Sequence, residues 1–505
     1  MDIKTIVRPI TETDCDTILT FLAEGNAGYG GATDALDKAL NGAIQELIDG
    51  GDFVGKSGQV SVVYPRGVIS AKRIILVGLG NPDQFSPTVL RRAVATGVVH
   101  ARKMKSKRVA TVLVRGGGDK TISVSNSAQA VAEGAVMGLY TYRGQKSDTT
   151  PQDEIDGIEI TVFAQSDLSE AELGARRGLA YGDGAVLARN LVNLPPNICT
   201  PAFMAERATD LANKKKMRVE ILEEGQMRAL KMGSLLGVAQ GSINTPRFII
   251  LEHNADKAGS VPTLVLVGKG VTFDTGGYSI KTAEGMVGMK ADMGGGAAVI
   301  SAMGIVADLE LPLHVVGIVP AVENMISDKA YRPQDVLTAS NGKTIEIIST
   351  DAEGRLILAD ALVYAKRYNP DAVVDIATLT GSCVIALGKA AAGLFATDDE
   401  LSAILTKAGD FTDEKVWRLP LYPEYEKAIE SDTADIKNTG GAKNGVGTSA
   451  IFLKHFVDYP RWAHIDMAGT MTDAEGNPAI PTKGATGYGA RLLAHFVELW
   501  SQKSS

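Results

Sequence analysis

Acidic and basic side chains gather after one apolar run in the second half of the sequence. The run Leu264–Val267 is followed by Lys269, Asp274, Lys281 and Asp292, which are set among glycines. In an open α/β sheet, the side chains that follow the carboxyl end of a strand face the ligand crevice. We therefore expect these four charged groups at one place, although either aspartate taken alone could cap a helix.

A second acidic pair, Asp351 and Glu353, follows the apolar residues Ile347 and Ile348. On extended backbone these two side chains share a face, and buried carboxylates repel one another unless a cation or a proton lies between them. Arg355 brings one positive charge, which cannot balance four acids. The pattern predicts two divalent cations about 3.5–4 Å apart, which would activate a water and polarise a carbonyl or phosphoryl oxygen.

The chemistry alone leaves two roles open for Lys269. A lysine among metal-binding carboxylates is either their ion-pair partner or, once deprotonated, a nitrogen ligand, because burial and nearby cations lower a lysine pKa. The residue types favour the ion pair. Lys281 and Arg355 remain as groups that could stabilise an oxyanion.

Three other motifs are interpreted as turns. The letters of Thr350–Gly354 recur at Thr472–Gly476, but the copy stands beside prolines and follows no apolar strand. Gly50–Ser57 fits the phosphate-binding P-loop pattern, yet a helical pattern precedes it and a strand-like run follows, the reverse of the order that phosphate binding needs. Gly78 and Gly80 lack the third glycine of a dinucleotide fingerprint, so NAD binding is not expected there.

The composition of the chain excludes several classes of protein. With 505 residues, 45% hydrophobic and 22% charged, the chain is globular and long enough for two or three domains. The polar start and the lack of long apolar runs predict no signal peptide, no membrane span and a cytoplasmic location. Three cysteines and six histidines without an HExxH pattern argue against a disulfide framework and against zinc held by thiolate or imidazole. The net charge of −8 argues against a nucleic-acid partner.

The elements that must position these residues follow an α/β rhythm. In the first part we expect helices at 32–48 and 87–104, strands at 59–64, 73–77 and 108–114, and a polar loop at 145–156. A long helix at 169–191 ends before Pro195 and Pro196, which cannot continue it. Beyond it we expect strands at 247–251, 263–267, 314–319, 344–348 and 372–376, and helices at 296–309, 356–368 and 484–499.

These elements predict an α/β protein with two domains. A smaller N-terminal α/β domain would occupy 1–165, with a role in assembly or regulation, and a connecting helix would occupy 166–196. The larger catalytic α/β domain would occupy 197–505. Its apolar strands do not alternate with polar residues, which predicts a central mixed sheet flanked by helices on both faces.

Several segments resemble the leucyl aminopeptidase (cytosol aminopeptidase) family. They are Val267–Lys281, Met289–Ala298, Thr350–Leu356, Asp375–Gly381, His464–Thr470 and Gly484–Leu493. The stretch from Tyr331 to Leu362 is the most specific. The resemblance covers most of residues 170–505 and is only architectural in the N-terminal third.

The resemblance implies two divalent metal ions, zinc or manganese, with magnesium or cobalt as alternatives. Lys269, Asp274, Asp292 and Glu353 would line the tighter site. Asp274, Asp351 and Glu353 would line the more exchangeable one, where Asp351 also offers its carbonyl. The family precedent thus makes Lys269 a neutral-amine ligand, which reverses the preference drawn from residue types.

The remaining site residues are also implied by the resemblance. Lys281 would polarise the scissile carbonyl, and Arg355 would hold a bicarbonate that acts as general base. The Leu379 carbonyl would help to position substrate. The side chain of the N-terminal substrate residue would enter a pocket lined by Met289, Thr378, Gly381, Ala468 and Met471. For the two methionines, core packing is the alternative.

Three positions depart from the family pattern without removing a ligand. Tyr278 stands where an aliphatic residue is frequent, Thr282 where proline is common, and Ser349 where asparagine is common.

The function expected is a metalloaminopeptidase that removes leucine and other apolar residues from peptides with a free N-terminus, as a homohexamer. One alternative adds a DNA-binding regulatory role, which a salt-dependent DNA shift assay would detect. A dinuclear phosphoesterase is compatible with the same carboxylates but usually includes histidine ligands. A catalytically silent protein is disfavoured because every expected ligand is present.

Overall fold

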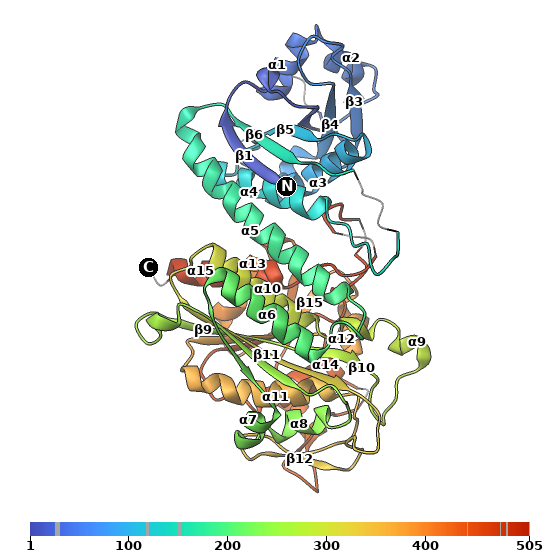
Figure 1. Cartoon of the computed structure of the whole chain (residues 1–505), viewed down its shortest axis with the longest axis vertical. Coiled ribbons are helices and arrows are strands. Elements are labelled where there is room, and N and C mark those ends of the chain that lie inside the picture. Colours follow the sequence, from blue (N-terminus) through green and yellow to red (C-terminus); the bar gives the residue numbers. More distant parts are fainter. Residues whose placement is uncertain are drawn as a thin grey trace. The chain divides into compact units, whose positions relative to one another are not determined.

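The structure is a computed structural model that describes residues 1–25, 31–117, 121–148, 153–441, 443–474, 476–480 and 483–503. The chain forms two compact units (Figure 1). The first contains Met1–Val186 with Glu475–Thr482, and the second contains Leu187–Ala474 with Lys483–Ser505. The predicted long helix is present as α5 (Leu168–Asn193), and the change from one unit to the other falls inside it. The domain limits 1–165, 166–196 and 197–505 stay a prediction.

The first unit is a six-stranded sheet with helices on both faces. Its strand order is β1 (Asp2–Val7), β6 (Gly157–Val162), β5 (Arg108–Val112), β2 (Thr17–Ala23), β4 (Arg73–Gly80) and β3 (Val60–Val63). Neighbouring strands are parallel except β3 and β4. The helices are α1 (Ala32–Ala39), α2 (Ala43–Asp49), α3 (Pro87–Lys103) and α4 (Val124–Gly138).

Alternation along the strands divides the core of this unit into two layers. Leu19 of β2 and Ile75 of β4 lie in one apolar cluster with residues of α3 and α4. Their neighbours Ile18 and Ile74 point to the opposite face and join the cluster that contains Leu36 of α1. Successive residues of a central strand therefore pack alternately against the two helix layers.

Three sequence-based expectations about elements are corrected. The helix expected at 32–48 is split into α1 and α2, because Asn41 and Gly42 adopt positive φ angles of 54° and 88°. The helix expected at 484–499 begins only at Ala490, after glycines with positive φ. The run 344–348 gives only β13 (Thr344–Glu346), which belongs to a small separate sheet with β12 (Val336–Thr338) and β17 (Ile436–Lys437).

The two glycine motifs of the first unit lie against each other. The Gly80 amide donates to the Gly55 carbonyl at 2.8 Å. A Cβ on Gly78 would stand 1.9 Å from the Lys56 carbonyl oxygen, so only glycine allows this approach. The strand β3 follows Ser57, with no helix between them. The turn interpretation of these residues holds. Residues 149–152 of the predicted loop, and Glu475 of the repeated motif, lie outside the described residues.

The second unit is built on a nine-stranded mixed sheet. The strand order is β16 (Val416–Arg418), β15 (Ala392–Ala396), β18 (Trp462–Asp466), β14 (Ala372–Ala377), β9 (Thr263–Gly268), β11 (His314–Asn324), β8 (Arg247–His253) and β7 (Arg218–Leu222). The ninth strand, β10 (Gly270–Asp274), also pairs with β11. Parallel and antiparallel pairs both occur.

Helices cover both faces of this sheet, as the sequence predicts (Figure 1). One layer contains α6 (Pro201–Lys215), α10 (Gly294–Asp308), α13 (Asp399–Thr412) and α15 (Ala490–Lys503). The other contains α8 (Gly233–Ala239) and α11 (Glu353–Ala365), with α14 (Gly445–Lys454) beside α11. Within the described segments, no helix has both the length and the apolar character needed to cross a bilayer.

The longest strand of the sheet, β11, pairs with two shorter strands in succession. Its residues His314–Ile318 pair with β9, and Ala321–Asn324 pair with β10. Lys269 is the single residue between β9 and β10. The ladder is therefore interrupted at the lysine that was expected in the metal site.

Candidate metal centre

The backbone of Lys269 is fixed on both sides. Its amide donates to the Ile376 carbonyl at 3.1 Å, and its carbonyl accepts from the Gly296 amide at 2.7 Å. A Cβ on Gly295 would lie 2.1 Å from the Ile376 oxygen, and one on Gly268 would lie 2.3 Å from the Gly295 oxygen. These glycines let the start of α10 approach the sheet closely enough to hold the lysine.

The buried ammonium of Lys269 has three oxygen partners. Nζ lies 2.9 Å from Asp292 Oδ1 and 2.8 Å from Glu353 Oε1, and it donates to the Thr378 carbonyl at 2.9 Å. Burial by itself lowers the pKa of Lys269, but the charges of Asp292 and Glu353 raise that pKa above its ordinary value. These contacts are those of an ion-pair partner, and a role as nitrogen ligand requires the loss of this proton.

The second lysine, Lys281, lies between two other carboxylates. Its Nζ is 2.8 Å from Asp274 Oδ2 and 2.5 Å from Asp351 Oδ1. Burial lowers the pKa of Lys281, whereas the charges of Asp274 and Glu353 raise it to a net value above the ordinary one. The structure therefore brings both lysines and all four predicted acids into one cluster.

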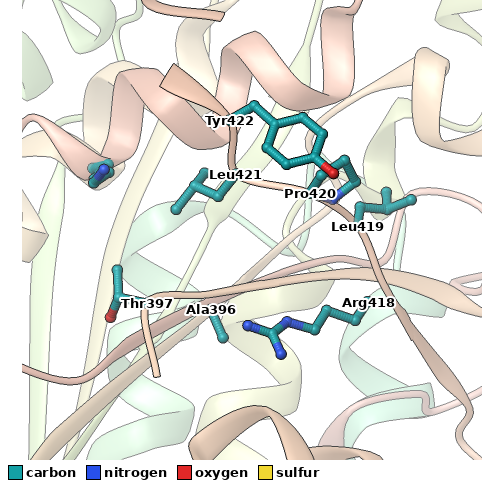
Figure 2. A pocket seen from close by; sticks show the side chains of 8 residues that line it. Ala396, Thr397, Arg418, Leu419, Pro420, Leu421 and Tyr422 are labelled. Carbon is teal, nitrogen blue, oxygen red and sulfur yellow. The ribbon is translucent and has the colours of Figure 1, made fainter. Parts of the chain in front are cut away.

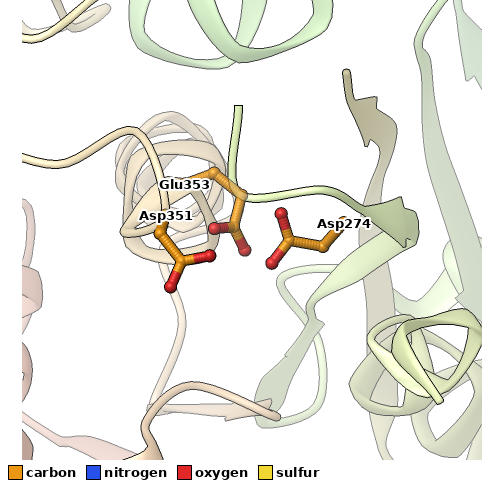
Figure 3. A group of neighbouring side chains, drawn as sticks. All are labelled: Asp274, Asp351 and Glu353. Carbon is orange, nitrogen blue, oxygen red and sulfur yellow. The ribbon is translucent and has the colours of Figure 1, made fainter. Parts of the chain in front are cut away.

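Carboxylate oxygens converge at the centre of this cluster. One ligand atom from each of Asp274, Asp351 and Glu353 lies within 4.8 Å of the other two, and Figure 3 shows the three groups pointing toward one another. Burial, followed by the charge of Glu353, raises the pKa of Asp274. Burial likewise raises the pKa of Asp292 well above its ordinary value. Such acids ionise readily only when further positive charge is present.

Two buried carboxylate oxygens of this cluster lack a hydrogen-bond partner among the described residues. They are Asp292 Oδ2 and Glu353 Oε2. An unsatisfied buried carboxylate oxygen is costly, so a native site normally provides a partner for it. Four acids against two lysines also leave an excess of negative charge. The donor set therefore fits divalent cations, which prefer oxygen ligands.

Three residues that the sequence did not mark as functional support Asp274 and the loops on either side of the acids. Asn324 Nδ2 donates to Asp274 Oδ1 at 2.8 Å and to the Thr350 carbonyl at 2.9 Å. The Tyr331 hydroxyl donates to the same carbonyl at 2.7 Å, and the Thr350 hydroxyl donates to the Gly276 carbonyl at 2.6 Å. The strand register pairs Asp274 with Asn324, and this pairing is seen only in the structure.

Gly354 lies directly against Lys269, which gives a testable expectation. A Cβ at Gly354 would stand 2.6 Å from Lys269 Cε and 2.7 Å from Nζ. We expect Gly354→Ala to displace the lysine and to lower metal affinity by roughly 10- to 100-fold. Gly225→Ala is the control, because nothing lies within 4 Å of its new methyl group. Titration of the metal-depleted variants measures the affinity, and equal affinities in the two would contradict the expectation.

Arg355, the other predicted catalytic residue, is buried in the first turn of α11. It donates to the Asn438 carbonyl at 2.9 Å, while its Nε finds no hydrogen-bond acceptor in the described part of the chain. Burial lowers the pKa of Arg355 to about 10. The Nε–H group of Arg355 can therefore still donate a hydrogen bond, close to the charge of Glu353.

The predicted substrate pocket is only partly defined by contacts. The Thr378 hydroxyl donates to Asp292 Oδ1 at 2.7 Å, which ties the pocket to the acids. Met471 is buried and packs on the start of α10, where a Cβ on Gly294 would stand 1.4 Å from its methyl carbon. This contact favours the packing role for Met471. Met289, Leu379, Gly381 and Ala468 remain predicted pocket residues.

The three departures from the family pattern have local partners. The Tyr278 hydroxyl donates to the Ser327 carbonyl at 3.0 Å. The Thr282 hydroxyl accepts from the Gly285 amide at 3.0 Å and caps the short helix α9 (Ala283–Met286). The Ser349 hydroxyl accepts from the Asp351 amide at 3.2 Å, so it supports a predicted ligand.

A separate hollow of about 660 Å³ lies at the edge of the sheet, near the ends of β15 and β16 (Figure 2). Arg418 and Lys454 contribute positive charge, but Arg418 already pairs with Asp399 at 2.6 Å. The Thr397 hydroxyl is engaged with the Trp462 backbone. None of the predicted site residues lines this hollow.

Comparison with known proteins gives matches over most of the chain. The catalytic-domain model of the cytosol aminopeptidase family matches residues 186–494, and the family's N-terminal-domain model matches 20–149. A probable cytosol aminopeptidase of Roseiflexus castenholzii is 44% identical over 92% of this chain and 95% of its own. One of Alkaliphilus oremlandii is 40% identical over 99% of both chains.

Two solved structures share the fold. The bottromycin maturation enzyme BotP in complex with Mn has a TM-score of 0.84 and 32% identity, over 96% of this chain and 99% of its own. A tomato leucine aminopeptidase mutant has a TM-score of 0.87 and 35% identity, over 98% of this chain and 96% of its own.

Proposed function

The chain belongs to the cytosol aminopeptidase family and is a metal-dependent aminopeptidase, and on that premise we propose how its site works. The proposal is that two divalent cations bind in the carboxylate cluster and that leucine and other apolar residues are removed from peptides with a free N-terminus. The observation that supports it most is the pair of unsatisfied buried oxygens, Asp292 Oδ2 and Glu353 Oε2.

Two overlapping ligand sets would hold the cations. Lys269, Asp274, Asp292 and Glu353 would bind one, and Asp274, Asp351 and Glu353 the other. Bound cations supply an activated water and a Lewis acid for the scissile carbonyl. The manganese named for the BotP structure supports manganese here, and zinc is the alternative, because oxygen ligands discriminate weakly between the two.

Side chains of the protein would stabilise the oxyanion, hold the general base and bind the substrate. Lys281, half-buried beside Asp274 and Asp351, would donate to the carbonyl oxygen as negative charge develops on it. Arg355 would direct its free Nε–H at an anion, and bicarbonate bound there would provide a general base. Met289, Thr378, Gly381 and Ala468 would receive the apolar side chain, with Leu379 positioning the backbone and Met471 behind them.

Metal removal tests this proposal. Dialysis against a chelator is expected to abolish hydrolysis of leucine amide, and added Mn²⁺ or Zn²⁺ is expected to restore it at two ions per subunit. Because bound ions stabilise only the folded state, metal at 100 times its Kd should add about 2.7 kcal/mol per site to the free energy of unfolding. N-acetyl-leucine amide is the control substrate, since it lacks the free amine. Saturation at one ion, or equal cleavage of the blocked amide, would contradict the proposal.

Three further expectations belong to the same proposal. The names of the relatives support a cytoplasmic location. A homohexamer is proposed from the family resemblance, and analytical ultracentrifugation measures it. The net charge of −8 argues against the alternative of an added DNA-binding role.

A further inference from the structure

Asp466, at the end of β18, is buried close to the metal centre but belongs to none of the ligand or pocket sets above. Its Oδ1 accepts from the backbone amides of Leu379 at 3.2 Å, Thr380 at 3.4 Å and Ala468 at 3.2 Å. Its Oδ2 accepts from the Thr380 hydroxyl at 2.6 Å. One carboxylate therefore joins two segments that are far apart in the sequence.

These two segments carry the predicted pocket residues other than Met289. Leu379 follows Thr378, whose carbonyl accepts from Lys269 Nζ and whose hydroxyl donates to Asp292. Ala468 lies on the other segment, after β18. The position of both pocket walls relative to the metal ligands thus depends on the hydrogen bonds of Asp466.

A second buried acid, Asp375, holds the side chains that precede Asp466 on β18. His464 precedes Asp466 by two residues on β18, so their side chains share a face. His464 Nδ1 lies 2.5 Å from Asp375 Oδ1, and the Trp462 indole donates to Asp375 Oδ2 at 2.7 Å. Burial lowers the pKa of His464, but the charge of Asp375 raises it above its ordinary value. Asp375 thus holds both Trp462 and His464 on the face of β18 that also carries Asp466.

The number of donors around Asp466 requires a carboxylate. An ionised carboxylate offers about four lone-pair sites and no donor, which suits three amides and one hydroxyl. An asparagine offers one acceptor oxygen, and its NH₂ group would face either the backbone amides or the Thr380 hydroxyl, which already accepts from the Cys383 amide at 3.0 Å. Replacement by asparagine keeps the shape of the side chain but leaves at least one donor, the Thr380 hydroxyl or the backbone amides, without its carboxylate acceptor, and a shift of one segment would relieve this loss.

We propose that Asp466 is a positioning residue that fixes the spacing between the Leu379–Thr380 and Ala468 walls, and thereby sets the preference for a large apolar N-terminal side chain. This inference rests on the proposed aminopeptidase function. The inference concerns discrimination between substrates. A change in this discrimination can therefore be measured apart from metal content and from the rate of the chemical step.

The matched test is Asp466→Asn against Asp360→Asn. Asp360 is another buried carboxylate of the same unit, and it accepts from the Leu235 amide at 2.8 Å and the Ser340 amide at 2.7 Å, with no bond to the metal cluster. In Asp466→Asn we expect two bound metals per subunit, a KM for leucine amide raised about tenfold, and a leucine-over-alanine ratio of kcat/KM lowered at least tenfold. Asp360→Asn should keep the wild-type ratio even where its Tm falls.

A second pair of variants, with smaller expected effects on folding, tests the inference if Asp466→Asn does not fold. Thr380→Val removes the hydroxyl bonded to Asp466, whereas Thr380→Ser keeps it. We expect Thr380→Val to lower the leucine-over-alanine ratio about threefold and Thr380→Ser to preserve it. Wild-type ratios in both Asp466→Asn and Thr380→Val, or a ratio that changes only with metal loss, would overturn the inference. Failure of the wild-type enzyme to cleave leucine amide would instead count against the proposed function.

Discussion

Replacing Glu353 with glutamine is expected to abolish the aminopeptidase activity and to remove metal from both sites. The substitution keeps the shape of the side chain but removes the charge that faces Lys269 Nζ at 2.8 Å. It also replaces one carboxylate oxygen by an NH₂ group, which cannot bind a cation. Because both proposed ligand sets share Glu353, we expect turnover of leucine amide to fall by at least about 10³-fold.

Metal content and turnover are the two measurements, made on the same preparation. The chain offers an internal control in its repeated letters, because Asp473 has the same sequence neighbours as Asp351. Asp473 is exposed and accepts from the Gly484 amide at 2.8 Å, and it is not one of the acids of the cluster. Asp351→Asn should weaken one metal site, while Asp473→Asn should change neither quantity. Near-normal hydrolysis by Glu353→Gln would refute the metal assignment.

The second large effect is expected from Lys281→Ala. This change removes the ammonium that lies between Asp274 and Asp351. Loss of one preorganised donor to a developing oxyanion costs roughly 10²- to 10³-fold in kcat. Metal should be retained, because the two carboxylates lose a competing positive charge and keep their oxygens.

Steady-state kinetics with parallel metal analysis separates these two outcomes. We expect a lower kcat, an almost unchanged KM and two metals per subunit. Lys215→Ala is the control for loss of a lysine charge, because Lys215 pairs with Asp308 at the surface. Should Lys281→Ala lose metal instead, Lys281 would have to be reassigned as a residue that holds the site together.

The acids of the site were predictable because they follow apolar runs in the sequence, although only Asp274 stands at the end of a strand. Asp274 follows apolar β-strand residues, and Asp351 and Glu353 lie between an apolar run and a helix, whereas the copy of that motif at Thr472–Gly476 lacks this context. Asn324 and Asp466 could not be found in this way. Their roles depend on which strands lie side by side, and pairings such as Asp274 with Asn324 are set by tertiary packing.

The fold was predictable in class but not in all its elements. Apolar strands without alternation indicated a sheet covered on both faces, and the structure confirms this. The break at Asn41 and Gly42 depends on left-handed backbone, which a helical apolar pattern does not reveal. The N-terminal family match at 20–149 also corrects the view that likeness there is only architectural.

The interruption of the ladder at Lys269 bears on how this centre could be transplanted. The lysine is held at that point because β11 spans both β9 and β10, and because α10 begins against its carbonyl. A designer who copied the acids and the lysine onto another scaffold would therefore copy the ligands without their support. The smallest portable unit is therefore β9, β10 and β11, the strand β14 whose Ile376 carbonyl accepts from the lysine amide, and the glycine-rich start of α10.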